Sequence, residues 1–125
     1  MLALWAACDL LRPWNDPDRD IDRKLGQDPR GLLVLEVGSV LVGAVMAGYD
    51  GHRGWINYLG VHPDHRRRGY GVRLVAAAEH YLNEMGCPKV NLQIRRSNQQ
   101  VIDFYGRLGY NTDDVVSMGK RLVVD

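Results

Sequence analysis

The sequence predicts an α/β fold with a mixed sheet, and three features of its pattern indicate this. Runs rich in valine and leucine at 32–37, 40–49 and 55–61 have the composition of β-strands. Short glycine-containing turns separate these runs, which is typical of an antiparallel meander. An amphipathic segment with helical spacing then begins near Tyr70, and a fourth strand-like run follows it, so the chain continues as strand–helix units.

Two helical segments are expected ahead of the meander. Met1–Leu11 has the pattern of the end of a helix. Asp16 and Pro17 form a good N-cap and first-turn pair for a short helix that stops near Gly26. The meander then starts, with a two-residue hairpin turn expected at 38–39.

The second half of the chain is expected to alternate between helices and strands. Gly86 is placed to end the helix that begins near Tyr70. The elements expected after it are a strand at Val90–Ile94, a helix that a capping box at Ser97–Gln100 starts and Gly109 stops, and a last strand at Val115–Val123, with a further short strand beginning near Tyr110.

Composition excludes several classes of protein. The 125 residues fit one domain, 1–125, and an apolar content of 46% is enough for a core. A net charge of +1 argues against a nucleic-acid partner, and no apolar segment is long enough for a membrane span. Cys8 and Cys87 lie far apart, which favours reduced thiols in a cytoplasmic protein over a disulfide.

The most informative stretch is Arg66-Arg67-Arg68-Gly69-Tyr70-Gly71, between a strand and a helix. A helix start presents free backbone N–H groups and the positive end of the helix dipole, and glycines allow a bulky anion to approach them. The pattern G-x-x-x-x-G-K-[ST] is absent, and the third glycine of G-x-G-x-x-G is replaced by Leu74. The turn therefore predicts a phosphate-bearing ligand, with a plain surface turn as the alternative.

Two separated motifs resemble those of the GNAT (GCN5-related) N-acetyltransferase family. Leu59-Gly60-Val61-His62-Pro63 followed by Arg66-x-x-Gly69-x-Gly71 resembles its acetyl-CoA motif. Asn98-x-x-x-x-x-Phe104-Tyr105-x-x-x-Gly109-Tyr110 resembles its second motif. The stretches at 8–17 and 48–54 are similar to the bacterial YpeA-type subgroup. The resemblance implies a mostly antiparallel central sheet flanked by helices, with the family's N-terminal strand and part of its first helix absent from this chain.

The resemblance also implies a binding site for acetyl-CoA, the acyl donor. Backbone groups of Leu59 and Val61 would pair with the pantetheine arm, and a bulge at Gly60 would splay this strand from the next one. Asn98 would hydrogen-bond the same arm, although it is equally a helix cap. The pyrophosphate would be held by backbone N–H groups of Arg67, Arg68, Gly69, Tyr70, Gly71 and Val72.

Tyr105 is the residue that the resemblance implies for catalysis. A phenol with an ordinary pKa of about 10 can protonate a departing thiolate at neutral pH. The alternative is a core tyrosine on the buried face of its helix. No general base is evident, because Gln93 stands where the ribosomal-protein N-terminal acetyltransferases carry a glutamate. The other residues at candidate positions are Trp55 and Asn57, and Asp50, His52 and Glu36 are replacements to consider beside a water relay or an amine bound neutral.

The sequence thus predicts an acetyl-CoA-dependent N-acetyltransferase that uses direct attack by a primary amine, with a small-molecule or peptide acceptor that remains open. The alternative is a non-catalytic module that binds acyl-CoA for sensing or assembly. No metal is expected, because His62 and His65 have no third ligand at useful spacing. The short N-terminus leaves the first strand less covered, and homodimerisation is one way to fill that gap.

Overall fold

The computed structural model describes residues 1–124, and the chain divides into two compact units, Met1–Leu92 and Gln93–Asp125. The expectation of one domain over 1–125 stays a prediction. Within the described residues, no helix is long and apolar enough to cross a lipid bilayer.

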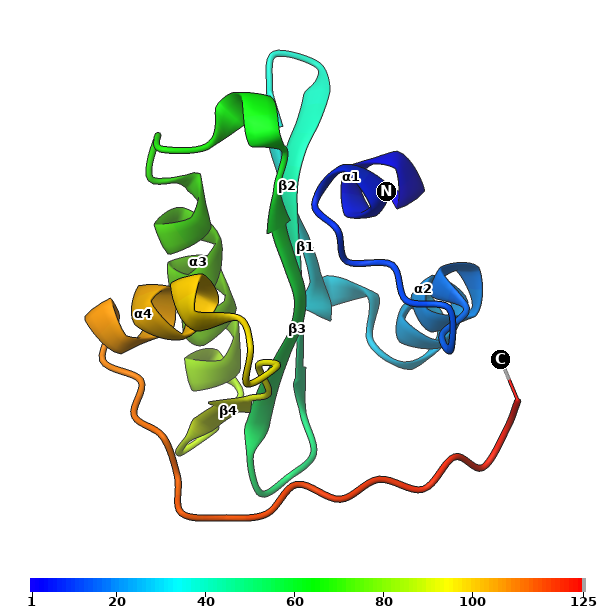
Figure 1. Cartoon of the computed structure of the whole chain (residues 1–125), viewed down its shortest axis with the longest axis vertical. Coiled ribbons are helices and arrows are strands. Elements are labelled where there is room, and N and C mark those ends of the chain that lie inside the picture. Colours follow the sequence, from blue (N-terminus) through cyan, green and yellow to red (C-terminus); the bar gives the residue numbers. More distant parts are fainter. Residues whose placement is uncertain (125) are drawn as a thin grey trace. The chain divides into compact units, whose positions relative to one another are not determined.

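The first unit is built on a four-stranded sheet with helices on both of its faces (Figure 1). Neighbouring strands follow chain order; β1, β2 and β3 are antiparallel, and β4 runs parallel to β3. This confirms the predicted mixed, mostly antiparallel sheet. The strands are β1 (Leu32–Val37), β2 (Val40–Tyr49), β3 (Gly54–Val61) and β4 (Val90–Leu92).

The helices of this unit enclose the sheet from two sides. On one face lies α3 (Tyr70–Glu84), which packs its buried residues against β2 and β3. On the other face lie α1 (Leu2–Ala7) and α2 (Pro17–Gln27), followed by the short 3-10 helix η1 (Pro29–Gly31) (Figure 1). The buried side chains of α3 are Leu74, Val75, Ala78 and Leu82. Their spacing of three and four residues is the amphipathic pattern that the sequence shows.

Several turn and cap signals act as the sequence predicts. The Asp16 carboxylate accepts a hydrogen bond from the Arg19 N–H at 3.2 Å and caps α2. Gly38 takes a left-handed φ of 63° in the two-residue turn between the paired residues Val37 and Val40. Left-handed backbone is nearly free of steric cost for glycine, which explains the residue chosen there.

Lys24 is the buried charged residue in the contact between α2 and the sheet. Its side chain is 7% exposed, and its ammonium donates a hydrogen bond to the Ala47 carbonyl oxygen at 2.5 Å. Burial lowers the pKa of Lys24 below its ordinary value of 10.5, and the nearby Asp28 carboxylate opposes this shift. The fold therefore carries a desolvated ammonium that one backbone carbonyl satisfies in part.

Replacing Lys24 by methionine is expected to remove a pH dependence of stability. Between the lowered pKa and 10.5, the unfolded chain binds more protons than the folded one, so the free energy of unfolding rises with pH. Methionine keeps the length of the side chain without the charge. Urea unfolding of both proteins at about pH 7 and about pH 10 measures the difference. An equal pH dependence in Lys24→Met would contradict this account.

The second unit holds α4 (Gln99–Arg107) and an irregular segment after it. The predicted capping box at Ser97–Gln100 is wrong by one residue. The N-cap is Asn98, whose side-chain oxygen accepts from the Val101 N–H at 3.4 Å. An asparagine amide fills this role as well as a serine hydroxyl, so the two signals compete when they are adjacent. Gly109 follows the helix with a φ of 94°, as expected for its C-terminal stop.

The strand expected at Val90–Ile94 forms, but it is shorter than predicted and ends at Leu92. The two strand predictions after it are wrong. No strand forms at Val115–Val123 or near Tyr110 within residues 1–124, and Val115 and Val116 are 77% and 86% exposed. A valine-rich segment forms a strand only where a neighbouring strand pairs with its backbone and its side chains are covered on one face. The sequence of this segment carries the propensity but cannot reveal whether such a neighbour is present.

Candidate functional site

The turn between β3 and α3 has the geometry of an anion cradle. Arg67 and Gly69 both take left-handed backbone, with φ of 63° and 76°. Gly69 is the N-cap of α3, and no side chain caps the helix there. The first N–H groups of a helix have no acceptor within the helix, so those of Tyr70, Gly71 and Val72 point out of its start. The start of α3 therefore combines free backbone N–H donors with the positive end of the helix dipole.

The side chains before the turn are occupied with its internal bonding. The Arg66 Nε donates to the Val61 carbonyl oxygen at 3.0 Å, which ties the turn back to the end of β3. His62 Nδ1 accepts from the Asp64 N–H at 3.2 Å, within the 3-10 helix η2 (Pro63–His65) and its cap. The described residues contain no group of three histidine, cysteine, aspartate or glutamate side chains that could hold a metal ion.

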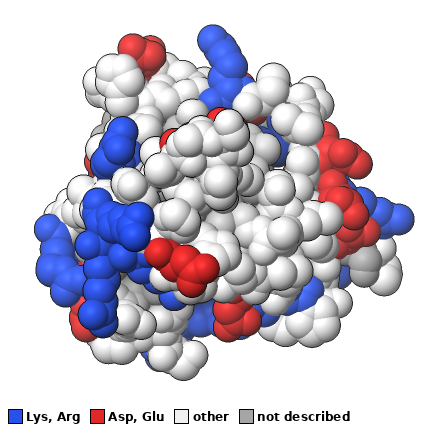
Figure 2. Space-filling view, turned by 90° about the horizontal axis from the view of Figure 1, so that it is seen from above, with Lys and Arg blue, Asp and Glu red and all other residues white. Residues whose placement is uncertain are grey.

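Arg66, Arg67 and Arg68 are all exposed beside the cradle. Figure 2 looks down on the end of the molecule where β3 runs into α3. It shows lysine and arginine side chains gathered on one side, with acidic side chains close by. The three arginines thus offer mobile positive charge to an anion bound at the turn.

The strand before the cradle contains a bulge, although not where the sequence placed it. Ala44 pairs with Gly60 and Met46 pairs with Asn57, so Tyr58 and Leu59 together stand opposite Val45. Tyr58 takes a left-handed φ of 53°. The bulge expected at Gly60 is therefore at Tyr58–Leu59, because a tyrosine adopts the conformation for which glycine is the usual sign.

Gly60 has another reason to be glycine. A Cβ at this position would lie 2.9 Å from the Cys8 sulfur and 2.9 Å from Leu10 Cδ1, since the segment after α1 crosses β3 here. Burial raises the pKa of the Cys8 thiol, and the neighbouring Arg66 side chain only opposes that shift. Cys8 thus lies beside the strand as a neutral thiol, a placement that no local sequence pattern reveals.

β4 leaves β3 before the bulge is reached. Within the first unit, the two strands pair only through Gly54, Trp55 and Ile56, which face Val90, Asn91 and Leu92. On the β4 side, the backbone of Leu59 to Val61 therefore has no partner from β4. An open strand edge of this kind can accept an extended ligand as though it were another strand.

In the second unit, Tyr105 lies on the buried face of α4. Its side chain is 5% exposed and makes edge-to-face contacts with Phe104 and Tyr110, at ring-centroid distances of 5.1 and 5.3 Å. Burial raises the pKa of Tyr105 above its ordinary value of 10. The phenol therefore keeps its proton across the neutral range and cannot act as a base there.

Comparison with known proteins identifies the family. Residues 1–110 match the model of the Acetyltransferase (GNAT) family. An acetyltransferase of Yersinia pseudotuberculosis is 54% identical over 125 residues, which cover 100% of this chain and 89% of that protein. The chain belongs to the GNAT family. The protein is accordingly an N-acetyltransferase, as the resemblance of its two motifs implies.

Solved structures agree with this assignment of the GNAT fold. A GCN5-related N-acetyltransferase from Ralstonia eutropha is 27% identical, with a TM-score of 0.65 over 84% of this chain and 74% of that one. The structure of AAC(6')-Iy in complex with the bisubstrate analogue CoA-S-monomethyl-acetylneamine has a TM-score of 0.73, covering 96% and 91% of the two chains. At 21% identity, that second likeness shows the shared fold.

Of the residues considered as a general base in this GNAT protein, Asp50 is engaged in the turn between β2 and β3. Its Oδ1 accepts from the N–H groups of Arg53 and His52 at 2.7 and 2.8 Å, and its Oδ2 from the Trp55 indole at 3.3 Å. The backbone N–H groups hold the pKa of Asp50 below its usual value, first through Arg53 and then through His52. A carboxylate stabilised in this way is a poor proton acceptor, so Asp50 serves the turn.

The two remaining residues from the second unit have local partners. Asn98 caps α4, which is the alternative role that the sequence left open for it. The Gln93 side-chain amide donates to the Ser117 hydroxyl, so this position makes a hydrogen bond between two neutral groups. Neither contact supplies a base.

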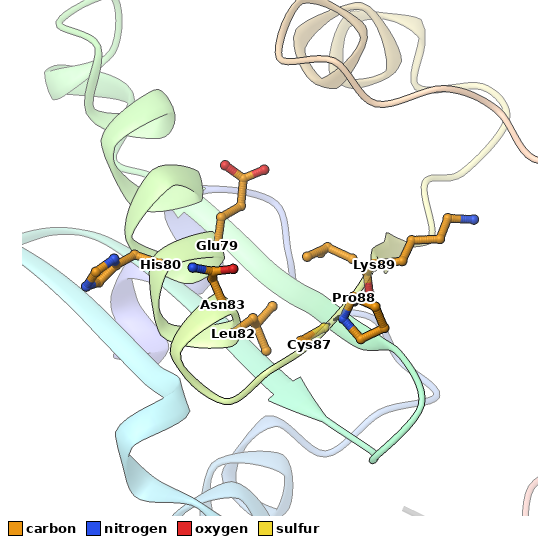
Figure 3. A pocket seen from close by; sticks show the side chains of 8 residues that line it. Glu79, His80, Leu82, Asn83, Cys87, Pro88 and Lys89 are labelled. Atoms are coloured by element: carbon orange, nitrogen blue, oxygen red, sulfur yellow. Dashed lines mark hydrogen bonds between the residues drawn. The ribbon is translucent and has the colours of Figure 1, made fainter.

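A pocket in the first unit lies away from these residues, between the C-terminal half of α3 and β4 (Figure 3). The Glu79, His80 and Lys89 side chains extend in different directions around it, and no polar cluster converges in it. Because it sits at the opposite end of α3 from Gly69, it is separate from the cradle. The full lining is Glu79, His80, Leu82, Asn83, Cys87, Pro88, Lys89 and Val90.

Proposed function

We propose that this protein moves an acetyl group from acetyl-CoA to a primary amine by direct attack of the amine in a ternary complex. The observation that carries the proposal is the uncapped start of α3 after the left-handed turn at Arg67 and Gly69. This turn comes after β3 and η2, and β4 leaves the edge of β3 open at Leu59–Val61. A nucleotide with a pyrophosphate and an extended amide arm could use both features, the helix start for the pyrophosphate and the strand edge for the arm.

Acetyl-CoA would supply the activated acetyl group as its thioester. The N–H groups from Arg67 to Val72 would hold the pyrophosphate, with Arg67 and Arg68 adding exposed guanidinium charge. Backbone groups of Leu59 and Val61 would bond to the pantetheine arm. Asn98 would add its side-chain amide as well as capping α4.

Tyr105 would act as the general acid. Its phenol Oη would hold the proton that the departing sulfur takes up, and the raised pKa of Tyr105 supports a phenol that is protonated at neutral pH. The raised pKa of the half-buried Cys8 thiol supports direct transfer, since a neutral thiol is a poor nucleophile for an acyl-enzyme route. With no side-chain base assigned, the amine would lose its proton to water or bind already neutral.

Isothermal titration calorimetry with acetyl-CoA tests the donor. The expected result is saturable binding with a stoichiometry of about one, as for a single site on each chain. A panel of primary amines then tests turnover, by release of free CoA thiol. Absence of binding by the unmodified protein would reject the proposal. Binding without turnover on any amine of a broad panel would favour the non-catalytic acyl-CoA module.

A further inference from the structure

Tyr58 holds a backbone conformation that a bulky residue rarely adopts. Its φ of 53° lies in the left-handed region, where the Cβ of any residue other than glycine meets the following carbonyl. Such a conformation persists only where the surrounding structure holds it, and residues of this kind concentrate at functional sites. Tyr58 stands directly before Leu59–Val61, the strand that is proposed to take the pantetheine arm.

Two contacts hold the Tyr58 side chain, and both come from the helices on the face of the sheet that α3 does not cover. The Trp5 ring of α1 stacks on the Tyr58 ring, with a centroid distance of 3.9 Å and an interplanar angle of 4°. The Tyr58 hydroxyl donates to Oδ2 of Asp20 in α2 at 2.5 Å. Trp5 is 0% exposed, and within the described residues its indole N–H has no hydrogen-bond partner, so packing holds that ring.

These contacts fix the place where β3 changes direction. The ladder between β3 and β4 ends at Ile56, and the bulge at Tyr58–Leu59 follows two residues later. A bulge increases the local twist and re-aims the strand beyond it. The edge of Leu59–Val61 is therefore oriented through Tyr58, and Tyr58 is oriented through Asp20 and Trp5.

We propose that Tyr58, held by Asp20 and Trp5, is a positioning residue that sets the open edge of Leu59–Val61 for acetyl-CoA. The inference rests on the proposed function, since it assumes that this edge receives the pantetheine arm. It assigns to the hydrogen bond between the Tyr58 hydroxyl and the Asp20 carboxylate an effect on donor affinity, although neither group touches the donor.

The first unit offers a matched control for this hydrogen bond. The Tyr81 hydroxyl donates to Oδ2 of Asp28, which joins α3 to the residue that follows α2. Both tyrosines are partly buried, and each donates to an aspartate, Asp20 within α2 and Asp28 directly after it. Tyr81 lies outside β3, so its loss tests stability without moving the bulge.

The experiment measures the dissociation constant of acetyl-CoA by calorimetry for a set of variants. Tyr58→Phe and Asp20→Ala are each expected to raise it about fivefold, the effect of one lost hydrogen bond on the bound geometry. Asp20→Ala also removes an ion pair with Arg23, at 3.5 Å. The double variant should bind no more weakly than Asp20→Ala alone, because Tyr58→Phe removes a bond that Asp20→Ala has already removed. Asp20→Asn keeps an acceptor oxygen and should stay within about twofold of the parent protein, as should Tyr81→Phe.

The outcomes separate this inference from the proposed function. If the parent protein binds acetyl-CoA and the Tyr58→Phe and Asp20→Ala variants bind it equally well, the positioning role is rejected and the proposed function stands. If Tyr81→Phe weakens binding as much as Tyr58→Phe does, the effect is one of general stability and the inference is also rejected. A parent protein that does not bind acetyl-CoA rejects the proposed function first, and the inference with it.

Discussion

Tyr105→Phe is expected to lower kcat by about 100-fold or more, while the dissociation constant for acetyl-CoA changes less than about twofold. The phenylalanine ring fills the same volume and keeps the edge-to-face contacts with Phe104 and Tyr110. Only the hydroxyl group is lost, so a departing thiolate would leave without a general acid. Steady-state release of free CoA on an accepted amine measures kcat, and calorimetry measures donor binding.

The pH dependence of the parent enzyme gives this prediction a second test. The neutral phenol is the active form of an acid, and the raised pKa of Tyr105 moves its deprotonation above the ordinary value of 10. The kcat of the parent enzyme should therefore show no loss due to this group up to about pH 10. Tyr81→Phe, the same substitution on a tyrosine without a catalytic assignment, serves as the control. Unchanged kcat in Tyr105→Phe would leave Tyr105 as an ordinary core residue.

The first unit was largely predictable because its signals are local. Strands separated by glycine turns can be recognised from a few adjacent residues, and so can a helix capped by Asp16 or ended by Gly86. The uncapped start of α3 belongs to the same class, since Gly69 and Gly71 mark it directly. Signals of this kind need no knowledge of which distant segments meet.

Apart from the one-residue error at the cap of α4, the errors arise where distant segments decide the local structure. The bulge falls at Tyr58, which Trp5 contacts from α1 and Asp20 from α2, whereas a glycine at position 60 suggested the wrong residue. Position 60 is glycine because Cys8 and Leu10, about fifty residues earlier in the chain, leave no room for a side chain. The strand expected at Val115–Val123 does not form for the same reason, since a strand needs a partner strand, which local sequence does not reveal.

The donor site can be tested by placing a negative charge at the start of α3. Gly71→Asp is expected to raise the dissociation constant of acetyl-CoA by about 100-fold or more, because a carboxylate would occupy the positive end of the helix dipole and repel the pyrophosphate. Gly71 is the better position than Gly69, whose φ of 76° would strain the backbone of any other residue and confuse binding with folding.

The asparagine variant separates charge from shape at this position. Gly71→Asn adds a side chain of nearly the same size without the charge, so its effect should be clearly smaller, about tenfold or less. A carboxylate in the first turn stabilises a helix, so Gly71→Asp should unfold at a temperature no lower than Gly71→Asn does. Rising salt should narrow the gap in affinity between the two, because ions screen the repulsion. Equal affinities at low salt would mean that the pyrophosphate binds elsewhere, since a charge at the helix start could not then be felt by the ligand.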